Sequence, residues 1–506
     1  MRRRCRPDRK RRRRRVAVAV ARALAWVAGA SAILGVLDLV STLLCIRLWV
    51  STADFGAATL AIALFPILDR LGGLGLGAAL VREPSPESEA SVFWLALGAA
   101  GALTALLVAA HPLIARAFGQ PIVASLLAAY AARGAVQAVV LVPEARMRRA
   151  LRFDELSAIR VIAGGCETAT KLGLAYAGAH GEPALRVWCF AAGPIAGSLV
   201  TAIGVQLREP WRPRLSFARA AAWRAARFTA ALSGGELLYY AYTSADYLVV
   251  GACFGDAAVG AYRLAYELVV DVVRLVSMIT AEVAYPVFVR ATNVRDQLVR
   301  FTQQNAFALA PILVAIAVEA DDLLALLYGA LPPAAALAAR ILCIVGALRV
   351  LSFVIPPMLA AIGEPRRALA YHAIALVVLP AAFAIGGAVG RDVTAVAWAW
   401  AIGYPIAFAA LLALALPRAH LSLAVYLRAL RGVAICALGA AAAGIGVRAL
   451  FDSPWRALPV CAAIALVYAL LLARLEGVTP RSLARSFAAG RATAATAPAR
   501  APSPDT

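Results

Sequence analysis

The sequence predicts an all-α polytopic membrane protein with about fourteen transmembrane helices, arranged as two six-helix lobes and two extra C-terminal helices. Three observations lead to this fold class. Of the 506 residues, 62% are hydrophobic and only 15% are charged, whereas a soluble domain is about half apolar and a quarter charged. Apolar segments long enough to cross a bilayer recur along the chain, and arginine is concentrated in alternate connections between them. This composition argues against a soluble enzyme.

The predicted spans follow from the thickness of the bilayer, because a helix needs about 20 apolar residues to cross a hydrocarbon core of about 30 Å. Six spans of the first half lie near residues 24–50, 54–80, 92–117, 121–142, 157–178 and 184–206. Six spans of the second half lie near residues 228–253, 259–289, 303–328, 334–362, 369–389 and 394–416. Two last spans lie near residues 432–450 and 456–474.

These spans divide the chain into six segments. They are a basic cytoplasmic arm (1–23), an N-lobe (24–206), a basic cytoplasmic linker (207–227), a C-lobe (228–416), two additional spans (417–475) and a tail (476–506). The tail is rich in Ala, Pro, Ser and Arg, a composition that buries little apolar surface, so we expect it to be disordered and cytoplasmic.

Arginine marks one side of the membrane. The basic connections include Arg146–Arg152, Arg208–Arg224 and Arg290–Arg300, whereas the intervening connections Ser51–Ala53 and Gly255–Asp256 contain no arginine. Cytoplasmic loops carry the excess of Lys and Arg. An even number of spans then places both termini in the cytoplasm.

The excess of 50 Lys and Arg over 28 Asp and Glu is explained by this topology. The basic run Arg2–Arg15 is expected to anchor the N-terminus and to contact anionic lipid headgroups. Because no soluble basic domain is present in the pattern, nucleic acid is not expected as a partner.

The two halves share short motifs in the same order. Gly56-Ala-Ala-Thr-Leu-Ala61 at the start of the second span corresponds to Gly260-Ala-Tyr-Arg-Leu-Ala265 at the start of the eighth. Arg148-Arg-Ala-Leu151 corresponds to Arg366-Arg-Ala-Leu369. Because each copy has six spans, both copies enter the membrane from the same side and the repeat is parallel. Paired repeats around a central cavity are typical of alternating-access transporters.

Several motifs resemble one known family. The matching segments are Asp54-Phe55-Gly56, Leu74–Val81, Val92–Trp94, Arg146–Phe153, Asp246–Gly251 and Gly260–Tyr262. Over about residues 24–416 the chain resembles bacterial oligosaccharide flippases, the Wzx-like polysaccharide transporter branch of the superfamily that includes the MATE exporters. The resemblance implies a two-lobed helical fold that carries polyprenyl-diphosphate-linked sugar units across the inner membrane. It further implies a role in lipopolysaccharide O-antigen, capsule or exopolysaccharide synthesis, with a polysaccharide polymerase and chain-length proteins as partners.

Ten charged residues lie near the centres of predicted spans, where each would cost about 2.5–3.5 kcal/mol if it faced lipid. They are Asp38, Asp69, Arg70, Arg133, Glu167, Lys171, Glu267, Asp271, Arg274 and Arg349. The total free-energy cost of exposing all ten charges to lipid would be too large for a stable fold. We therefore expect these side chains to face one another or water inside a polar cavity.

Four of the cations are candidates for binding the diphosphate that the resemblance implies: Arg133, Lys171, Arg274 and Arg349. Arg133 is the strongest candidate, because it has no acid within one turn of its own helix. A guanidinium also suits a diphosphate, since its planar fork can bond two oxygens at once.

Four acids complete the predicted cavity: Glu167, Asp246, Glu267 and Asp271. Each has a structural alternative. Glu167 lies four residues before Lys171, so the two can form an ion pair on one helix face. Glu267 and Asp271 can likewise belong to a one-face ladder with neighbouring arginines. Asp246 matches the acidic position of the resembled family, or caps a neighbouring helix.

A group of tyrosines surrounds the seventh and eighth spans: Tyr239, Tyr240, Tyr242, Tyr247, Tyr262 and Tyr266. These rings could stack on sugar faces, although tyrosine belts at the membrane interface are the commoner arrangement.

No pattern in the sequence predicts catalysis, a metal site or a cofactor. The stretch Gly72–Gly77 follows no strand, so it is interpreted as helix-packing glycine and not as a phosphate-binding loop. The eight cysteines form no CxxC pair and the four histidines are dispersed. Transport would then be driven by substrate exchange or by a gradient of H⁺ or Na⁺.

Three other functions remain open at this point. A MATE-like ion-coupled exporter of small molecules would need a cavity dominated by acids, whereas the central charges here are mixed. A flippase for lipid-linked peptidoglycan precursors would also have fourteen spans. A membrane-embedded glycosyltransferase or polymerase would need a large extracytoplasmic loop with catalytic acids, and the predicted outer loops are short.

Overall fold

The computed structural model describes residues 6–73, 76–82, 85–451 and 455–478, and within these ranges the chain is helical with no β-strand. The first half forms α1 (Arg6–Leu48), α2 (Thr52–Gly73), α3 (Gly77–Arg82), α4 (Pro86–Ala109), α5 (His111–Phe118), α6 (Pro121–Arg149), α7 (Phe153–His180) and α8 (Leu185–Arg208). The second half begins with α9 (Arg219–Phe254), α10 (Asp256–Tyr266), a π-helical turn (Glu267–Asp271), α11 (Val272–Arg290) and α12 (Val294–Tyr328). It continues with α13 (Pro333–Ser352), α14 (Ile355–Ala361), α15 (Pro365–Val389), α16 (Val393–Ala415) and a 3₁₀ turn (Leu416–Ala419). The last helices are α17 (Leu423–Ala429), α18 (Arg431–Leu450) and α19 (Ala457–Leu475).

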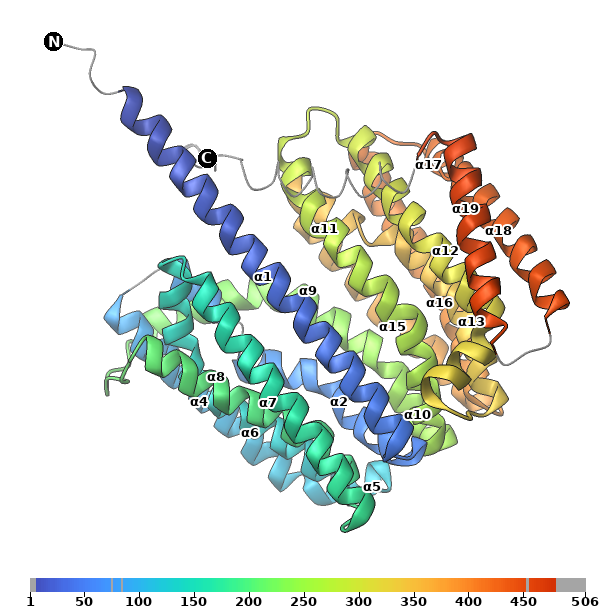
Figure 1. The fold of residues 1–506 in the computed structure, drawn as a ribbon. Helices are drawn as coiled ribbons and strands as arrows, with labels where there is room; N and C mark the ends of the chain where they lie inside the picture. Colours follow the sequence, from blue (N-terminus) through green and yellow to red (C-terminus); the bar gives the residue numbers. More distant parts are fainter. Residues whose placement is uncertain (1–5, 74–75, 83–84, 452–454, 479–506) are drawn as a thin grey trace.

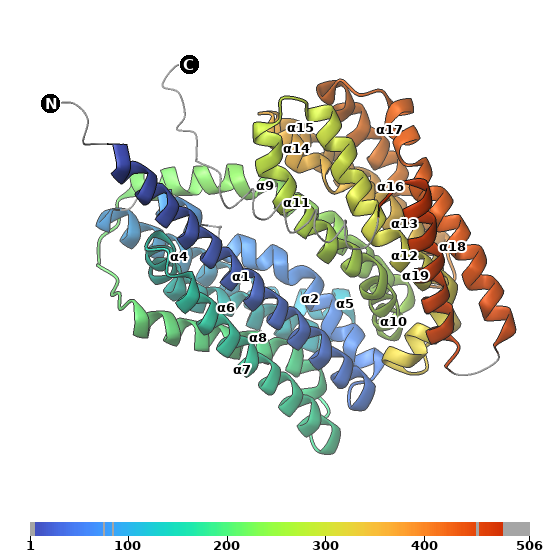
Figure 2. The same ribbon diagram turned by 45° about the horizontal axis from the view of Figure 1, so that its top comes forward.

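The helices form two groups that lie side by side (Figures 1 and 2). In the first group, α7 packs on α8 and α1, and α6 packs on α4, α2 and α8. In the second group, α15 packs on α16 and α9, and α13 packs on α12 and α16. We call these groups the N-lobe and the C-lobe. Helices α2 and α10 form the main contact between the lobes, and α9 also packs on α2 and α4.

Within the described residues, eleven helical segments are long and apolar enough to cross a membrane. Three other helices coincide with predicted spans but lie outside this set: α7, α9 and α12, with 28, 36 and 35 residues. They are more polar, since α7 carries Glu167 and Lys171 and α12 carries Glu319 and two aspartates near its end. The structure therefore shows a multi-pass membrane protein, while the number fourteen stays a prediction.

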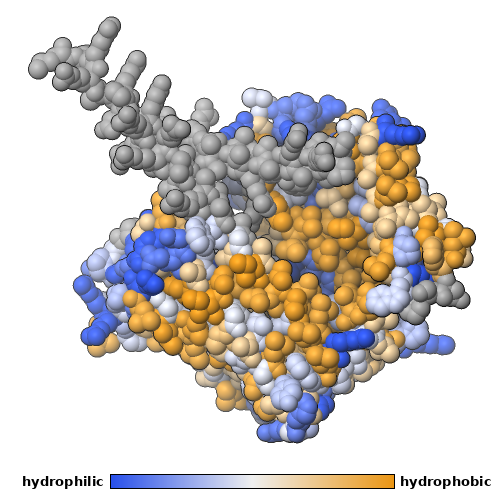
Figure 3. Space-filling view, in the orientation of Figure 1, coloured by the Kyte–Doolittle hydropathy of each residue, from blue (hydrophilic) through white to orange (hydrophobic). Residues whose placement is uncertain are grey.

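The outer surface of the helices is apolar, as Figure 3 shows for one face. Leu106, Val377 and Leu438 are 63%, 71% and 71% exposed and represent a larger set of exposed Leu, Ile, Val and Trp side chains. Soluble monomers rarely expose apolar patches of this extent. Such a surface is matched to lipid chains, which explains how a composition of 62% hydrophobic residues is accommodated.

The ends of several helices are set by proline and glycine. Proline lies in the first turn of α4, α5, α6, α13 and α15, where its missing N–H is not required. Gly255 has a φ of +81° and separates α9 from α10. A residue with a Cβ would be strained there, so this glycine permits the sharp reversal between the two helices.

The boundary between the lobes differs from the sequence prediction. Residues 219–227, which were expected in a linker, form the first turns of α9. The connection itself covers only residues 209–218 and is held against the N-lobe, because Trp94 Nε1 donates to the Arg214 carbonyl at 2.9 Å and the Ala218 N–H to Ser91 Oγ at 2.8 Å. At the N-terminus, residues 6–23 of the expected arm belong to α1. The first five residues and most of the expected tail lie outside the described residues.

Helices α18 and α19 pack on each other and on α12. Arg456 contacts Asp322 of α12 at 2.7 Å, and Arg448 contacts Glu319 at 3.4 Å. Glu319 has non-helical backbone angles (φ −110°, ψ 24°) at a kink in α12. The kink lies where the two last helices attach, and they lie outside the contact between the lobes.

Candidate functional site

The cations of the N-lobe have acidic partners on neighbouring helices. Arg133 of α6 contacts Asp69 of α2 at 2.8 Å and donates to Ser198 Oγ of α8 at 2.6 Å. Lys171 of α7 contacts Asp38 of α1 at 3.1 Å and donates to a threonine hydroxyl of α1 at 2.5 Å. Each pair neutralises a charge between helices, as mid-membrane charges require.

Glu167 lies beside this cluster without an ion-pair partner among the described residues. Its carboxylate packs against Gly197 of α8, where an added Cβ would lie 3.0 Å from Oε2. The sequence left open an ion pair between Glu167 and Lys171, but the described part of the chain pairs Lys171 with Asp38 instead. A helix face alone does not fix the partner, because α1 brings a nearer acid.

In the C-lobe, the predicted ladder of charges is present. Arg263 contacts Glu267 at 2.7 Å and Asp271 at 3.3 Å, and Arg274 contacts Asp271 at 3.1 Å. The π-helical turn lies between Arg263 and Arg274, and π-turns are frequent at functional sites. The side chain of Arg274 is 46% exposed, so this end of the ladder is accessible.

Arg349 is surrounded by aromatic side chains. Its guanidinium donates to the hydroxyls of Tyr266 at 2.9 Å and Tyr239 at 3.2 Å. The rings of Tyr239, Trp400 and Tyr404 lie 5.9, 5.3 and 5.8 Å from its central carbon. We call these residues the Arg349 box. Among the residues that the structure describes, no carboxylate forms an ion pair with Arg349, although it is only 4% exposed.

Asp246 is fully buried behind this box. Trp400 Nε1, the Tyr262 hydroxyl and the backbone N–H of Tyr247 donate to its carboxylate at 2.8, 3.0 and 2.8 Å. Its exposed fraction is 0%, so Asp246 lies in the C-lobe core and not on a surface that a ligand reaches. The three donors satisfy the carboxylate where it stands.

The two lobes are joined at the ends of the helices whose connections lack arginine, which we call the arginine-poor end. There Gln120 donates to Asp256, and Arg47 donates to the Ala325 carbonyl at 3.2 Å. Further into the interface, the Ser244 hydroxyl of α9 donates to the Ala63 carbonyl of α2 at 2.6 Å. These contacts cross between residues far apart in the sequence.

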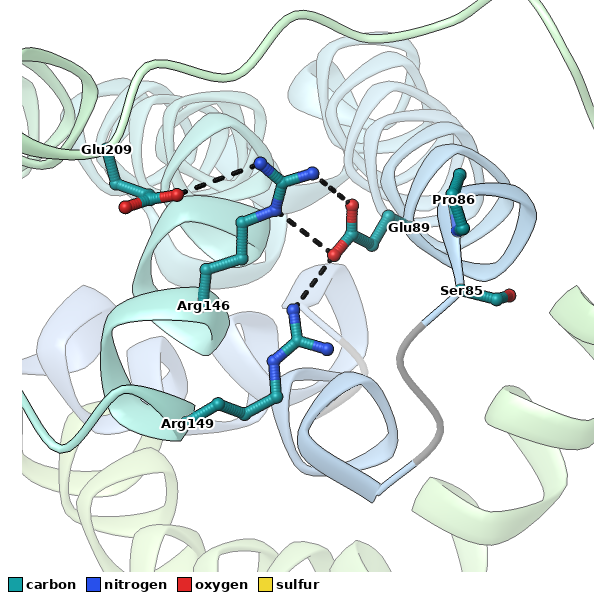
Figure 4. Close-up of a pocket in the computed structure, with 6 residues that line it drawn as sticks. All are labelled: Ser85, Pro86, Glu89, Arg146, Arg149 and Glu209. Carbon is teal, nitrogen blue, oxygen red and sulfur yellow. Dashed lines mark hydrogen bonds and ion pairs between the residues drawn. The ribbon is translucent and has the colours of Figure 1, made fainter.

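At the opposite, arginine-rich end, the N-lobe has a charged cavity of about 340 Å³. Figure 4 shows Arg146 between Glu89 and Glu209, with Arg149 also directed at Glu89. Arg146 contacts Glu89 at 2.6 Å and Arg149 contacts it at 2.9 Å. Next to this cavity, Arg152 contacts Glu155 at 2.7 Å. The hydrogen bonding to Glu155 raises the pKa of Arg152. The network fastens α4, α6, α7 and the end of α8 to one another.

The structure therefore divides the eight predicted cavity residues into two sets. Arg133 and Lys171, with Glu167 beside them, lie in the N-lobe, whereas Arg274, Arg349, Asp246, Glu267 and Asp271 lie in the C-lobe. The sequence did not point to Ser198, Trp400 or Tyr404. Their partners come from other helices, and a serine, tryptophan or tyrosine within an apolar span gives no signal of its own. Tyr239 and Tyr266 were singled out, as stacking residues, and in the structure they contact Arg349.

An all-helical, multi-pass fold with two lobes and paired charges between its helices is typical of membrane transporters. A family model described as polysaccharide biosynthesis protein matches residues 46–331. The chain belongs to this family, which confirms the resemblance found in the sequence.

Curated relatives agree with this assignment. The lipopolysaccharide biosynthesis protein WzxC of Escherichia coli (strain K12) is 24% identical over 343 residues, which cover 64% of this chain and 66% of WzxC. The succinoglycan biosynthesis transport protein ExoT of Rhizobium meliloti (strain 1021) is 25% identical over 55% of this chain and 56% of ExoT. The teichuronic acid biosynthesis protein TuaB of Bacillus subtilis (strain 168) is 24% identical over 55% and 58%. The match thus covers between 56% and 66% of the length of these relatives.

Two solved structures share the fold. The lipid II flippase MurJ in an inward closed conformation superposes with a TM-score of 0.72 at 15% identity, covering 88% of this chain and 98% of MurJ. An inward-facing multidrug resistance MATE family transporter superposes with a TM-score of 0.57 at 15% identity, covering 82% of this chain and 98% of that transporter. At this identity the similarity establishes the fold alone.

Proposed function

We propose that this protein is a flippase that moves polyprenyl-diphosphate-linked oligosaccharide units across the inner membrane by alternating access. Its product would serve the synthesis of a surface polysaccharide: O-antigen, capsule or exopolysaccharide. Family membership and relatives named for lipopolysaccharide, teichuronic acid and succinoglycan biosynthesis support the substrate class. The two-lobed fold supports the mechanism. A polymerase and chain-length proteins would act on the same glycan as partners, and the chain itself would be no enzyme.

One observation carries the choice of a diphosphate substrate. Of the four candidate cations, Arg133, Lys171 and Arg274 are each paired with an aspartate in the described structure, whereas Arg349 is not. A buried guanidinium without a counterion is unfavourable unless a ligand or a polar partner solvates it. We assign Arg349 as the group that binds the diphosphate.

We propose that a ligand would bind where two phenols now accept hydrogen bonds from Arg349. Phosphate oxygens would replace the hydroxyls of Tyr239 and Tyr266 and form charge-assisted hydrogen bonds, which are about twice as strong as neutral ones. Tyr239 is only partly buried, so its movement gives access to the guanidinium. The polyprenyl chain would remain in lipid beside the lobes.

The contact between the lobes at the arginine-poor end supports entry of the substrate from the cytoplasmic side. We propose that both termini are cytoplasmic, so that the arginine-poor end, where the lobes meet, faces outward. At the arginine-rich end, Arg146 pairs with Glu89 within the N-lobe and Arg367 pairs with Glu364 within the C-lobe, whereas Arg70 of α2 contacts Glu236 of α9 across the lobes at 2.9 Å. A transporter closed outside can receive a substrate that is assembled inside. Movement would be driven by substrate exchange or by an H⁺ or Na⁺ gradient.

The test uses a host strain that lacks its own flippase and depends on this chain for glycan export. Arg349→Ala should abolish surface polysaccharide while the amount of protein in the membrane is unchanged, and Arg349→Lys should restore only part of it, because an ammonium lacks the bidentate fork. Arg366→Ala, at an exposed position of α15, is the matched control and should export normally. Normal export by Arg349→Ala would refute the assignment.

A second function is favoured by the structural similarity to the lipid II flippase. A peptidoglycan precursor flippase of the same fold would rescue growth of cells depleted of their lipid II flippase. Rescue by this chain, without effect on surface polysaccharide, would replace the proposed substrate. Export of small cationic compounds in place of either glycan would instead indicate a MATE-like exporter.

A further inference from the structure

We propose that Trp400 and Asp246 are positioning residues that hold the guanidinium of Arg349 as the diphosphate-binding cation of the C-lobe. The proposal rests on the proposed function, because it concerns the same cation. Both residues are 0% exposed, so neither would contact substrate. Asp246, predicted from the sequence as a cavity residue, is thereby given a supporting role.

Trp400 of α16 lies between an acid and a base. Its indole N–H donates to Asp246 Oδ2 of α9 at 2.8 Å. The same ring faces Arg349 of α13, whose central guanidinium carbon lies 5.3 Å from the ring centre. Three helices are thus connected through one side chain: the acid lies at the edge of the indole, and the base lies over a face of it.

The two contacts of Trp400 reinforce each other. An indole has a positive edge and a negative face, so its edge suits a carboxylate and its face suits a cation. Donation of the N–H to Asp246 polarises the ring toward greater electron density on its face, as hydrogen-bonded groups in series polarise one another. The charge of Asp246 therefore stabilises Arg349 through the ring.

The indole also keeps the two charges from touching. A direct Arg–carboxylate pair is commonly bidentate and would occupy the N–H groups of the guanidinium. With Trp400 between them, Arg349 uses two hydrogen bonds, both to tyrosine hydroxyls, among the described residues. These neutral acceptors are weaker partners than a phosphate, so the cation remains available to a ligand.

The geometry of the acid supports this role. The Tyr262 hydroxyl and the Tyr247 N–H fix the carboxylate from two other directions. The three hydrogen bonds of the Asp246 carboxylate are all donated to it, an arrangement that suits a fixed anion. A fixed anion at the edge of the indole gives Arg349 a constant electrostatic environment.

The experiment uses the purified full-length protein in detergent and the short-chain probe farnesyl diphosphate, with farnesol as the probe that lacks the diphosphate. The measured quantity is the ratio of the affinity for farnesyl diphosphate to the affinity for farnesol.

Arg349→Gln should remove the preference for the diphosphate. Trp400→Phe retains a ring face but loses the N–H, and Asp246→Asn retains size but loses charge; each should lower the ratio about tenfold, equivalent to about 1.4 kcal/mol. Because both act through one contact, the double variant should be no worse than either single variant.

Trp398→Phe is the matched control, since Trp398 lies on the same helix and is 50% exposed; its ratio should equal that of the unmodified protein. Loss of both affinities in proportion would show that Trp400 and Asp246 only maintain the fold, and would overturn the inference. If Trp400→Phe does not fold, Asp246→Asn decides in the same way. An unchanged ratio in both variants, together with loss in Arg349→Gln, would overturn the inference and leave the proposed function standing. An unchanged ratio in Arg349→Gln would overturn the proposed function as well.

Discussion

Gly56 of α2 and Gly260 of α10 lie in reciprocal contact at the crossing of the two lobes. A Cβ added to Gly56 would lie 1.8 Å from the Asp256 carbonyl oxygen, and a Cβ added to Gly260 would lie 1.9 Å from the Thr52 carbonyl oxygen. Gly260 and Asp256 follow Gly56 and Thr52 by the same number of residues. The matching motifs of the two halves therefore meet at equivalent positions, backbone against backbone.

This crossing leads to a first prediction. Gly56→Ala or Gly260→Ala should prevent full closure of the arginine-poor end, because the clash is with rigid backbone, and overpacking of this kind costs about 1–3 kcal/mol. In a cysteine-free background, a cysteine introduced at Ala63, now 6% exposed, should be alkylated faster. Gly101→Ala is the control, since a Cβ there meets open space. Unchanged alkylation would show that closure does not depend on the crossing.

The pair of Arg133 and Asp69 gives a second prediction. Removal of either partner leaves a charge in the membrane, so Arg133→Ala or Asp69→Ala should lower the amount of folded protein, at a cost of about 1–3 kcal/mol after allowance for solvent screening. The exchange Arg133→Asp with Asp69→Arg should restore much of it. If Arg133→Ala instead abolishes export at a normal protein level, Arg133 belongs to the substrate site, as the sequence predicted.

A third prediction concerns the attachment of α19. Asp322→Ala removes the carboxylate that Arg456 contacts at 2.7 Å, so α18 and α19 should separate more easily from α12, with a loss of about 1–3 kcal/mol. Protease cleavage of the connection near residue 455 should become faster, whereas polysaccharide export should fall only in proportion to protein level. Asp392→Ala removes an exposed cap of α16 and provides a comparison. A selective loss of export in Asp322→Ala would place the last two helices in the transport path.

A fourth prediction concerns acid sensitivity at the arginine-rich end. Hydrogen bonds from Arg152 lower the pKa of Glu155, so this contact stabilises the turn above the ordinary glutamate pKa of about 4.3. The stabilisation is lost as the pH falls through the lowered value. The protection factors of the backbone amides of residues 150–156, which correct for the intrinsic pH dependence of hydrogen exchange, should therefore fall below about pH 4. In Arg152→Gln the exchange should already be fast at neutral pH, and an identical acid response in both proteins would contradict the argument.

The positions of the spans could be predicted because hydropathy along one helix is a local property. The expected span 432–450 is α18, Arg431–Leu450, and the expected span 259–289 lies within the continuous helical segment Asp256–Arg290. The π-helical turn inside that segment and the kink at Glu319 were not predicted. Both depend on tertiary packing, for which these residues carry no proline or glycine signal.

The sequence could predict which charged residues need partners, but not which residue each of them pairs with. That central charges would have partners followed from the cost of leaving them in lipid. Which acid meets Lys171 depends on how α1 lies against α7, and periodicity contains no information about that. The burial of Asp246 and the box around Arg349 depend on four helices meeting. The sequence therefore predicted both as cavity residues, although their surroundings in the structure differ.

The attachment of α18 and α19 has an evolutionary consequence. This helical hairpin contacts the remainder of the protein mainly through α12, and its polar contacts are concentrated around Arg448 and Arg456. A hairpin attached mainly to one helix can be acquired or lost by a lineage without rebuilding the two lobes. Selection on that hairpin is then separate from selection on the interior, and its exposed face is free to diversify for contacts that differ from one host membrane to another.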